Sequence, residues 1–516
     1  MVTSAPAGTN PMPPCLVCNA PWPALVAACL SLGGCMVGPH YTPPNSNMPP
    51  RYGERADSAA TVAENMDSEE CAWWHRFGDE ELASLVERAI ATNNSLKAAE
   101  ARVRQARSAR EVARSLLYPR IGVGASALRF RGSESAIGLP DADLEGSFFQ
   151  IGFDAEWTID LFGGTRRLVE STRAQEQVAE SRRRGVVLMI AAETARAYME
   201  LRGAQRQLEV ALATLSDQRE TLRVTEDRHS NGLASNLEVV RARTEVERTA
   251  AEIPPIEQAI RQYIHILSTL MALEPTALSD ELVSPSILPV VPDRIAVGVP
   301  SDLLRRRPDI QAAERHIASA TAMIGVATAQ LFPQLILGAS GGFSSRRSGD
   351  LFNGNSATSP STYYLAGPAI NWTLFDAGRR RATIRISEAE VDAARALYED
   401  TVLAAFREVE SALVAVDRDR ARVTDLERLS ASAREVMTIA QGDYRNGLLD
   451  QLTVLDAQRQ ASRADMLLVQ GQVALMVSVV RLYKALGGGW EFAEPVPPHP
   501  SAWAGSDASV SAKENP

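Results

Sequence analysis

The stretch VLMIAAETARAYMELRGAQRQLEVALATL, residues 187–215, places small and apolar side chains at spacings that alternate between three and four residues. Such a seven-residue period predicts a long helix that supercoils in a left-handed sense against its neighbours. The same positions return 215 residues later, at Val402, Ala405, Val409, Ala412 and Val416. We therefore expect two very long helices, over 165–230 and 379–445, each about 100 Å long. The positions in the first copy are Val187, Ile190, Thr194, Ala197, Leu201, Ala204, Leu208, Ala211 and Leu215.

The chain is an internal duplication. The turn Asn231-Gly232-Leu233 returns as Asn446-Gly447-Leu448, and Trp157-Thr158 returns as Trp372-Thr373, both at an offset of 215. An offset that stays this constant indicates a repeated structural unit. Each copy is expected to hold a first helix, a β-hairpin, the long helix, a tight turn at Asn-Gly-Leu and a last helix. The first helices are expected over 79–116 and 301–331, and the last helices over 236–272 and 450–486.

Four segments between the helices alternate apolar with small or polar residues: 121–127, 149–159, 335–343 and 364–374. A period of two predicts strands with one apolar and one polar face. In a soluble protein the apolar face would cover a core. The Gly/Ser/Asp-rich loops over 132–146 and 344–362, and aromatic residues near the strand ends, favour a sheet in an outer membrane instead.

A sheet of four strands cannot close on itself inside a bilayer. The unpaired N–H and C=O groups of an open edge are forbidden in lipid, and the smallest membrane barrels have about eight strands. Other copies of the chain must therefore complete the sheet, which predicts a cyclic oligomer.

The first 35 residues read as a leader. Residues 23–32, PALVAACLSL, form an apolar run that is too short to cross a bilayer and matches the centre of a secretory signal peptide. The run ends in Leu32-Gly33-Gly34-Cys35, which resembles a bacterial lipobox and would make Cys35 the lipid-anchored first residue of the mature chain. No Lys or Arg precedes Arg51, so the usual positive segment is missing. An ordinary apolar tail around a buried cysteine is the alternative.

Composition and motifs argue against several classes of function. A net charge of -10 argues against nucleic-acid binding, which depends on basic patches. The sequence has no phosphate-binding glycine loop and no His-Glu-x-x-His. Cys15-x-x-Cys18 lies in the leader without a second Cys/His pair. We expect no enzymatic activity, no metal site and no cofactor other than a covalent lipid on Cys35.

These features together resemble the outer membrane factor family, the TolC-like exit ducts, and most of all the NodT-type lipoproteins that serve resistance-nodulation-division pumps. The resemblance covers about residues 35–490. It implies a mainly α protein with membrane β: a homotrimer in the cell outer membrane, with four strands per chain in one twelve-strand barrel continued by an α-helical periplasmic tunnel. The motifs that carry it include Trp73-Trp74-x-x-Phe77, Arg306-Arg307-Pro308-Asp309-Ile310, Phe332-Pro333, Phe375-Asp376-Ala377-Gly378 and Leu452-Thr453-Val454-Leu455-Asp456-Ala457-Gln458.

The resemblance also implies partners and sites. A periplasmic adaptor protein would dock at the two tips, which are Asn231, Gly232, Leu233, Asn446, Gly447 and Leu448. An inner-membrane resistance-nodulation-division pump would supply the cargo. The family's periplasmic gate maps onto Asp450, Leu452 and Asp456, with Leu237 as the first-copy equivalent of Leu452. Symmetry-related leucines can form a dewetting constriction, and carboxylate rings favour cations. The alternatives are an ordinary coiled-coil core position for Leu452 and a solvated helix face for the aspartates.

The expected organisation has six parts. They are a signal peptide (1–34), a lipidated N-terminal tether (35–75), a first repeat (76–275), a linker (276–300), a second repeat (301–488) and a disordered tail (489–516). Two other functions stay open: an exit duct of a type I protein secretion system, and a structural trimeric coiled coil without transport. The latter predicts strands at one end of the chain, whereas here strands interrupt both halves. The cargo, whether drugs, solvents or metals, is not encoded in the duct.

Overall fold

The computed structural model describes residues 36–45, 48–53, 61–62, 68–131, 145–352 and 361–493. The signal peptide, Cys35, residues 132–144 of the first predicted strand loop and residues 353–360 of the second lie outside these residues. The helices are η1 (Ser68–Phe77), α2 (Glu80–Thr92), α3 (Asn94–Ser115), α5 (Gly164–Ser230), α6 (Asn236–Leu270), α7 (Ser279–Leu282), η2 (Pro300–Asp302), α8 (Leu303–Arg306), α9 (Pro308–Ala329), η3 (Ser348–Asp350), α10 (Arg379–Arg445) and α11 (Gln451–Leu486). The strands are β1 (Thr61–Val62), β2 (Arg120–Arg131), β3 (Glu145–Ile159), β4 (Ile295–Ala296), β5 (Gln334–Ser345) and β6 (Thr362–Asn371).

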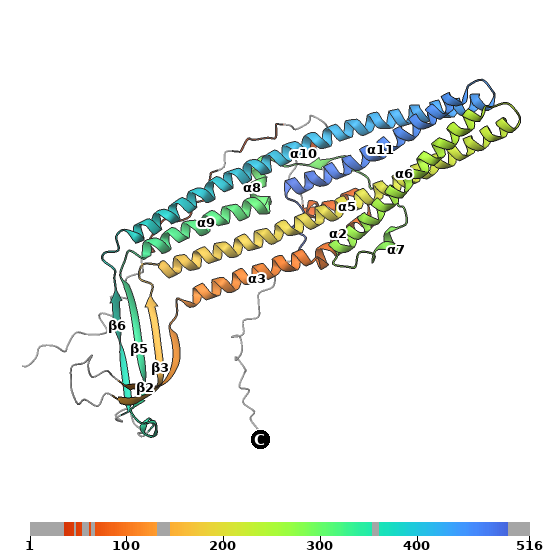
Figure 1. Ribbon diagram of the computed structural model, residues 1–516. Helices are drawn as coiled ribbons and strands as arrows, with labels where there is room; N and C mark the ends of the chain where they lie inside the picture. Colours follow the sequence, from red (N-terminus) through yellow and green to blue (C-terminus); the bar gives the residue numbers. More distant parts are fainter. Residues whose placement is uncertain are drawn as a thin grey trace, which may run out of the picture. The chain divides into compact units, whose positions relative to one another are not determined.

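The chain divides into two compact units, and both repeats contribute to each of them. The strand unit takes Leu117–Arg167 from the first repeat and Gly325–Ala377 from the second. The helical unit takes Leu168–Ile324 and the chain from Gly378 onward, together with Pro39–Leu116. Figure 1 shows the four long strands of the first unit and the paired long helices of the second.

The strand unit is one antiparallel sheet in the order β2-β3-β5-β6. Its register aligns Val123 with Phe153, Phe153 with Gly341 and Gly341 with Tyr364, so the predicted apolar positions share one face. On that face Phe153 is 64% and Tyr364 84% exposed, which shows that the face does not cover a core within the subunit. Among the described residues, β2 and β6 each pair with one neighbour only, and the sheet therefore has two open edges.

The long helices match the sequence expectation closely. α5 begins one residue before the expected 165, and α10 has the expected bounds. The seven-residue positions are buried in both copies, with Val187 and Val409 fully so, and only Leu208 is partly exposed. The period therefore marks the side on which the helices pack, as the left-handed pattern requires.

The two first helices are each divided, which corrects the single helices expected over 79–116 and 301–331. Asn93 separates α2 from α3, because its side-chain oxygen accepts from the backbone N–H groups of Ser95 and Leu96 and starts a new helix. Arg307 separates α8 from α9 because it precedes Pro308, and its backbone is extended at φ -75° and ψ 120°.

The N-terminal tether lies on the helical unit instead of acting as a free spacer. The hydroxyl of Tyr41 donates to Glu314 on α9 at 2.8 Å. Tyr52 is buried and stacks on Phe406 of α10 with ring centroids 5.9 Å apart. β1 pairs in parallel with β4, which lies in the predicted linker. The predicted tether therefore makes specific contacts with the second repeat and with the linker.

An aromatic cluster holds the two ends of the described chain together. Trp73 is fully buried and stacks on Tyr483 of α11 at a centroid distance of 5.2 Å. Trp490 donates its indole N–H to the Arg306 carbonyl at 2.9 Å, and Phe492 packs edge-on against Trp74 at 5.4 Å. Residues 489–493 are therefore ordered, contrary to the expected disordered tail, because aromatic side chains anchor them. Residues 494–516 lie outside the described residues.

In the part of the chain that the structure describes, α11 is the one helix long and apolar enough to cross a bilayer. Within the protein, 56% of the most apolar stretch of α11 is buried. That burial is typical of a core helix in a helical bundle.

Trp73→Ala should destabilise the helical unit by about 3–5 kcal/mol, because it leaves a cavity where the indole stacks on Tyr483. Thermal unfolding of the purified full-length protein followed by circular dichroism measures the loss. Phe375→Ala is the matched control, since the Phe375 side chain is 85% exposed. Equal melting temperatures for both variants would contradict the aromatic cluster as a stability determinant.

Candidate functional site

The turn between α5 and α6 closes the first predicted tip. Gly232 has φ of 73°, in the left-handed region that favours glycine. Its N–H donates to the His229 carbonyl at 2.9 Å, and the N–H of Leu233 donates to the Arg228 carbonyl at 2.8 Å. These two bonds satisfy the last carbonyls of α5 and end the helix.

The turn between α10 and α11 repeats this geometry at an offset of 215 residues. Gly447 has φ of 76°, and its N–H donates to the Tyr444 carbonyl at 3.0 Å. The N–H of Leu448 donates to the Asp443 carbonyl at 2.8 Å. The duplicated Asn-Gly-Leu sequence therefore produces two turns of the same type.

The helices that leave the two tips are capped at equivalent positions. Ser235 caps α6 in a reciprocal capping box with Glu238. Asp450 caps α11, because its carboxylate accepts from the Thr453 backbone N–H at 2.9 Å and from the Thr453 hydroxyl at 2.5 Å. The Thr453 hydroxyl, and next its backbone N–H, hold the pKa of Asp450 below its ordinary value. A proposed gate carboxylate is thus ionised and fixed at a helix N-terminus.

The two tips lie side by side at one end of the helical unit (Figure 1). Arg228 of the first tip donates to the Tyr444 carbonyl of the second at 3.3 Å and lies over the Tyr444 ring at 4.8 Å. Leu233 is 69% and Leu448 73% exposed. The Asn231 side chain donates to the Asp227 carbonyl at 2.7 Å, and the Asn446 N–H donates to the Gly442 carbonyl at 3.2 Å. The asparagines thus form hydrogen bonds within the turns, and the leucine side chains are exposed.

The other proposed gate residues are exposed within their own chain. The side chain of Leu237 is 57% exposed and that of Leu452 is 50% exposed. Leu452 is therefore not a core position of the subunit's own coiled coil. Asp456 is exposed and accepts from the Gln460 side chain at 2.6 Å. The proposed gate residues therefore lie next to the two tips, Leu237 at the first and the other three at the second, and their side chains in helices α6 and α11 are exposed within the chain.

Sequence reasoning missed a row of polar contacts between the repeats, which we call the polar seam. It consists of Thr214–Ser462, Thr221–Gln458 and Thr225–Gln451 between α5 and α11, at oxygen–oxygen or nitrogen–oxygen distances of 3.2, 2.8 and 3.1 Å. The signal was present, because the buried positions of α5 continue after Leu215 as Gln218, Thr221 and Thr225. A search for apolar residues at a seven-residue spacing does not detect these buried polar positions.

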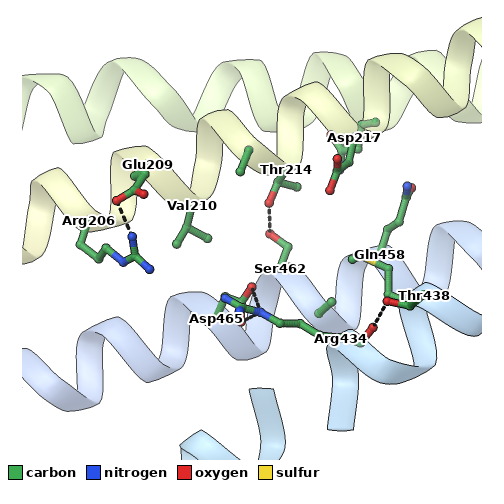
Figure 2. Close-up of a pocket in the computed structure, with 14 residues that line it drawn as sticks. Arg206, Glu209, Val210, Thr214, Asp217, Arg434, Thr438, Gln458, Ser462 and Asp465 are labelled. Carbon is green, nitrogen blue, oxygen red and sulfur yellow. Dashed lines mark hydrogen bonds and ion pairs between the residues drawn. The ribbon is translucent and has the colours of Figure 1, made fainter. Parts of the chain in front are cut away.

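The polar seam opens into a groove between α5 of the first repeat and α10 and α11 of the second. Figure 2 shows Thr214 and Asp217 on α5 facing Ser462 and Gln458 on α11. Ion pairs hold the groove's rim: Arg206 with Glu209 and Arg434 with Asp465. In the described part of the chain no group of three or more His, Cys, Asp or Glu side chains is gathered to hold a metal ion. The arrangement is suited to binding and packing.

Comparison with known proteins identifies a family. A family model for outer membrane efflux proteins matches residues 85–272 and 299–488. The chain is 31% identical over 466 residues to the outer membrane protein OprJ of Pseudomonas aeruginosa, which covers 90% of this chain and 94% of that protein. It is 31% identical over 491 residues to nodulation protein T of Rhizobium leguminosarum, covering 94% and 98%. The solved outer-membrane channel OprN superposes with a TM-score of 0.81 at 35% identity, covering 89% of this chain and 100% of that chain.

Gly447→Ala should weaken the second tip by about 1 kcal/mol, because alanine at positive φ is strained while no neighbouring atom lies within 4 Å of the new methyl group. Hydrogen exchange should show faster exchange in the last turn of α10 and the first turn of α11. Gly442→Ala is the control: it lies inside α10 with equal free space and should slow exchange, because alanine favours a helix. Similar changes in both variants would contradict the left-handed turn.

Proposed function

The chain belongs to the outer membrane efflux protein family, and we propose from this premise that it is the exit duct of a tripartite efflux system. The expected membership is confirmed, and so is the TolC-like channel fold in the outer membrane with a periplasmic extension. The finer proposal is that the duct passively conducts small toxic compounds, such as drugs, solvents or metals. An inner-membrane pump and a periplasmic adaptor would hand these over. In this role the chain needs no catalytic residue and no cofactor.

The open edges of the strand unit carry this proposal. β2 and β6 present unpaired backbone groups on an exposed apolar sheet. In lipid these groups require partners, and only further strands supply them in register. Three copies with four strands each would give a barrel of twelve strands, which supports the homotrimer that the family resemblance implies.

We assign the periplasmic adaptor to the two tips. Their exposed leucines, Leu233 and Leu448, lie on rigid turns that glycine fixes. Exposed apolar side chains that gather at one place on a surface can mark a protein interaction site. A resistance-nodulation-division pump would be the source of cargo. A type I secretion system would use a different adaptor at the same tips, so the identity of the bound adaptor distinguishes the two functions.

Lipid attachment at Cys35 is a separate proposal, motivated by the sequence Leu32-Gly33-Gly34-Cys35. Intact mass spectrometry of the protein extracted from membranes should find a chain that starts at Cys35 and carries the mass of a diacylglyceryl modification. Cys35→Ser should accumulate with its leader uncut. A mature chain that starts elsewhere, without added lipid mass, would refute the anchor.

Gate function at Asp450, Leu452, Asp456 and Leu237 can be measured by conductance in planar bilayers. Leu452→Ala should raise the conductance of the closed duct, because a smaller side chain widens a dewetting constriction. Asp456→Asn should lower the preference for cations. Glu388→Gln, an exposed substitution near the start of α10, is the charge control and should leave both quantities unchanged. Unaltered conductance and selectivity in the first two variants would rule out a gate role for Leu452 and Asp456.

Photo-crosslinking in living cells tests the function as a whole. A crosslinking amino acid at Leu233 or Leu448 should capture the adaptor of a resistance-nodulation-division pump, identified by mass spectrometry. The control position is Ile287, which is 87% exposed in the linker between the repeats. Gln451 is unsuitable despite its place beside the tip, because it is 2% exposed. Capture of an adaptor from an ATP-driven secretion system would establish the alternative function, and no tip-specific partner would refute both.

A further inference from the structure

The first described residues of the chain are docked in the strand unit. The N–H of Val37 donates to the Phe162 carbonyl at 3.1 Å, a few residues beyond the end of β3. Met36 lies against Gly163, because a β-carbon added to that glycine would be 2.5 Å from the Met36 Cγ and 2.8 Å from its Cα. Residues 36–38, which we call the chain-end segment, therefore pack closely on the loop between β3 and α5.

Arg167 on the first turn of α5 holds the backbone of the chain-end segment. Its Nε donates to the Val37 carbonyl at 3.0 Å, and its Nη2 donates to the Gly38 carbonyl at 3.0 Å. The Arg167 residue is 0% exposed. Both acceptors are main-chain atoms, so this contact depends on the path of the backbone and not on the side chains of the segment. A guanidinium group suits the task, because it carries several donors in one fixed plane.

Both repeats contribute to the place where Arg167 is buried. Gly325 of α9 packs on the arginine side chain, since a β-carbon there would be 2.7 Å from the Arg167 Cγ and 2.8 Å from its Cδ. The Phe162 ring, in the loop after β3, stacks on the Phe332 ring, just before β5, with centroids 4.5 Å apart. The chain-end segment is therefore attached where the first and second repeats meet in the strand unit.

Burial makes this attachment specific. If the chain-end segment moved away, the Arg167 guanidinium would lose two hydrogen bonds from a position that solvent does not reach. A charged donor that loses its acceptor inside a protein is destabilised more than a neutral one. Release of the segment is therefore opposed by the arginine that it covers.

We propose that Arg167 is a positioning residue for the anchored end of the chain. Cys35 is the residue directly before Met36, so a group attached to Cys35 is held within one residue of the strand unit. A lipid on Cys35 would therefore enter the bilayer at the end of the sheet where β3 ends and β5 begins, and not at the end of a free spacer. This placement rests on the proposed lipid attachment, whereas the contact between Arg167 and the segment does not.

Hydrogen exchange at the Val37 N–H tests the proposal on the full-length protein extracted from membranes in detergent. Arg167→Met should speed this exchange about tenfold or more, because the segment loses both bonds to the guanidinium. Arg167→Lys should restore part of the protection, since an ammonium group keeps the charge but not the planar set of donors. Arg173→Met removes an exposed arginine from the same helix and should leave the exchange unchanged.

A second variant leaves the arginine in place. Gly163→Ala directs a methyl group into Met36 and should also speed exchange at Val37. Gly78→Ala is the matched control: its φ of 64° is also positive, but no atom lies within 4 Å of the new methyl group. It adds backbone strain without displacing the segment, so Val37 should keep its protection. If size-exclusion chromatography shows that Arg167→Met does not fold, the comparison of the two glycine variants decides.

Two results would overturn the positioning role. One is free exchange at Val37 in the unmodified protein, and the other is unchanged exchange in both Arg167→Met and Gly163→Ala. Intact mass spectrometry of the same samples tests the lipid separately. A protected Val37 in a chain without lipid mass would refute the anchor at Cys35, and the placement of a lipid with it, while the hold of Arg167 on the chain end would stand.

Discussion

The unpaired edges of the strand unit constrain everything else in this molecule. β2 and β6 each carry a row of N–H and C=O groups without a partner in the described chain. In hydrocarbon each such unpaired group costs several kcal/mol. The sum over a full edge is at least roughly as large as the stability of a whole domain. The subunit is therefore incomplete by itself, and its fold must supply surfaces that repeat around an axis. An internal duplication suits this requirement, because each copy contributes two strands and two helices of nearly equal length.

Small residues along the long helices allow these helices to pack closely. Thr194 and Ala197 of α5 are fully buried, as are Val409 and, nearly, Ala405 of α10. Alanine and threonine at these positions let helix axes approach more closely than leucine would, and dispersion contacts increase accordingly. The large aromatic residues are concentrated instead where short segments meet, as at Trp73. The seven-residue period thus produces a core of mainly small side chains along the long helices, and the aromatic residues around Trp73 add large side chains at one place.

Periodic features of this chain could be predicted, and single interactions could not. The long helices and the shared apolar face of the four strands follow from spacing, which every residue of the segment reinforces. The helix break at Asn93 depends on one capping side chain, and the break at Arg307 depends on the proline that follows it. The apolar period continues across both positions, so the period alone predicts one continuous helix in each case. The contacts of Tyr41 and Tyr52 depend on single aromatics in a proline-rich segment, where no period exists. The polar seam was missed because its residues occupy core positions with polar side chains.

The contact between the two repeats changes in character along α5, from an apolar core to the polar seam. In the part of α5 that precedes Leu215, the contact buries apolar side chains such as Leu201. Exposing this apolar area to water would cost about 25 cal/mol of free energy per Å². Beyond Leu215 the contact combines hydroxyl and amide pairs such as Thr225–Gln451 with apolar packing of Val224 on the cluster around Tyr444. Water replaces such pairs at a net cost of about 0.5–1.5 kcal/mol each. The contact between the repeats is therefore more polar toward the tips, where the turns at Gly232 and Gly447 each join the two helices of one repeat.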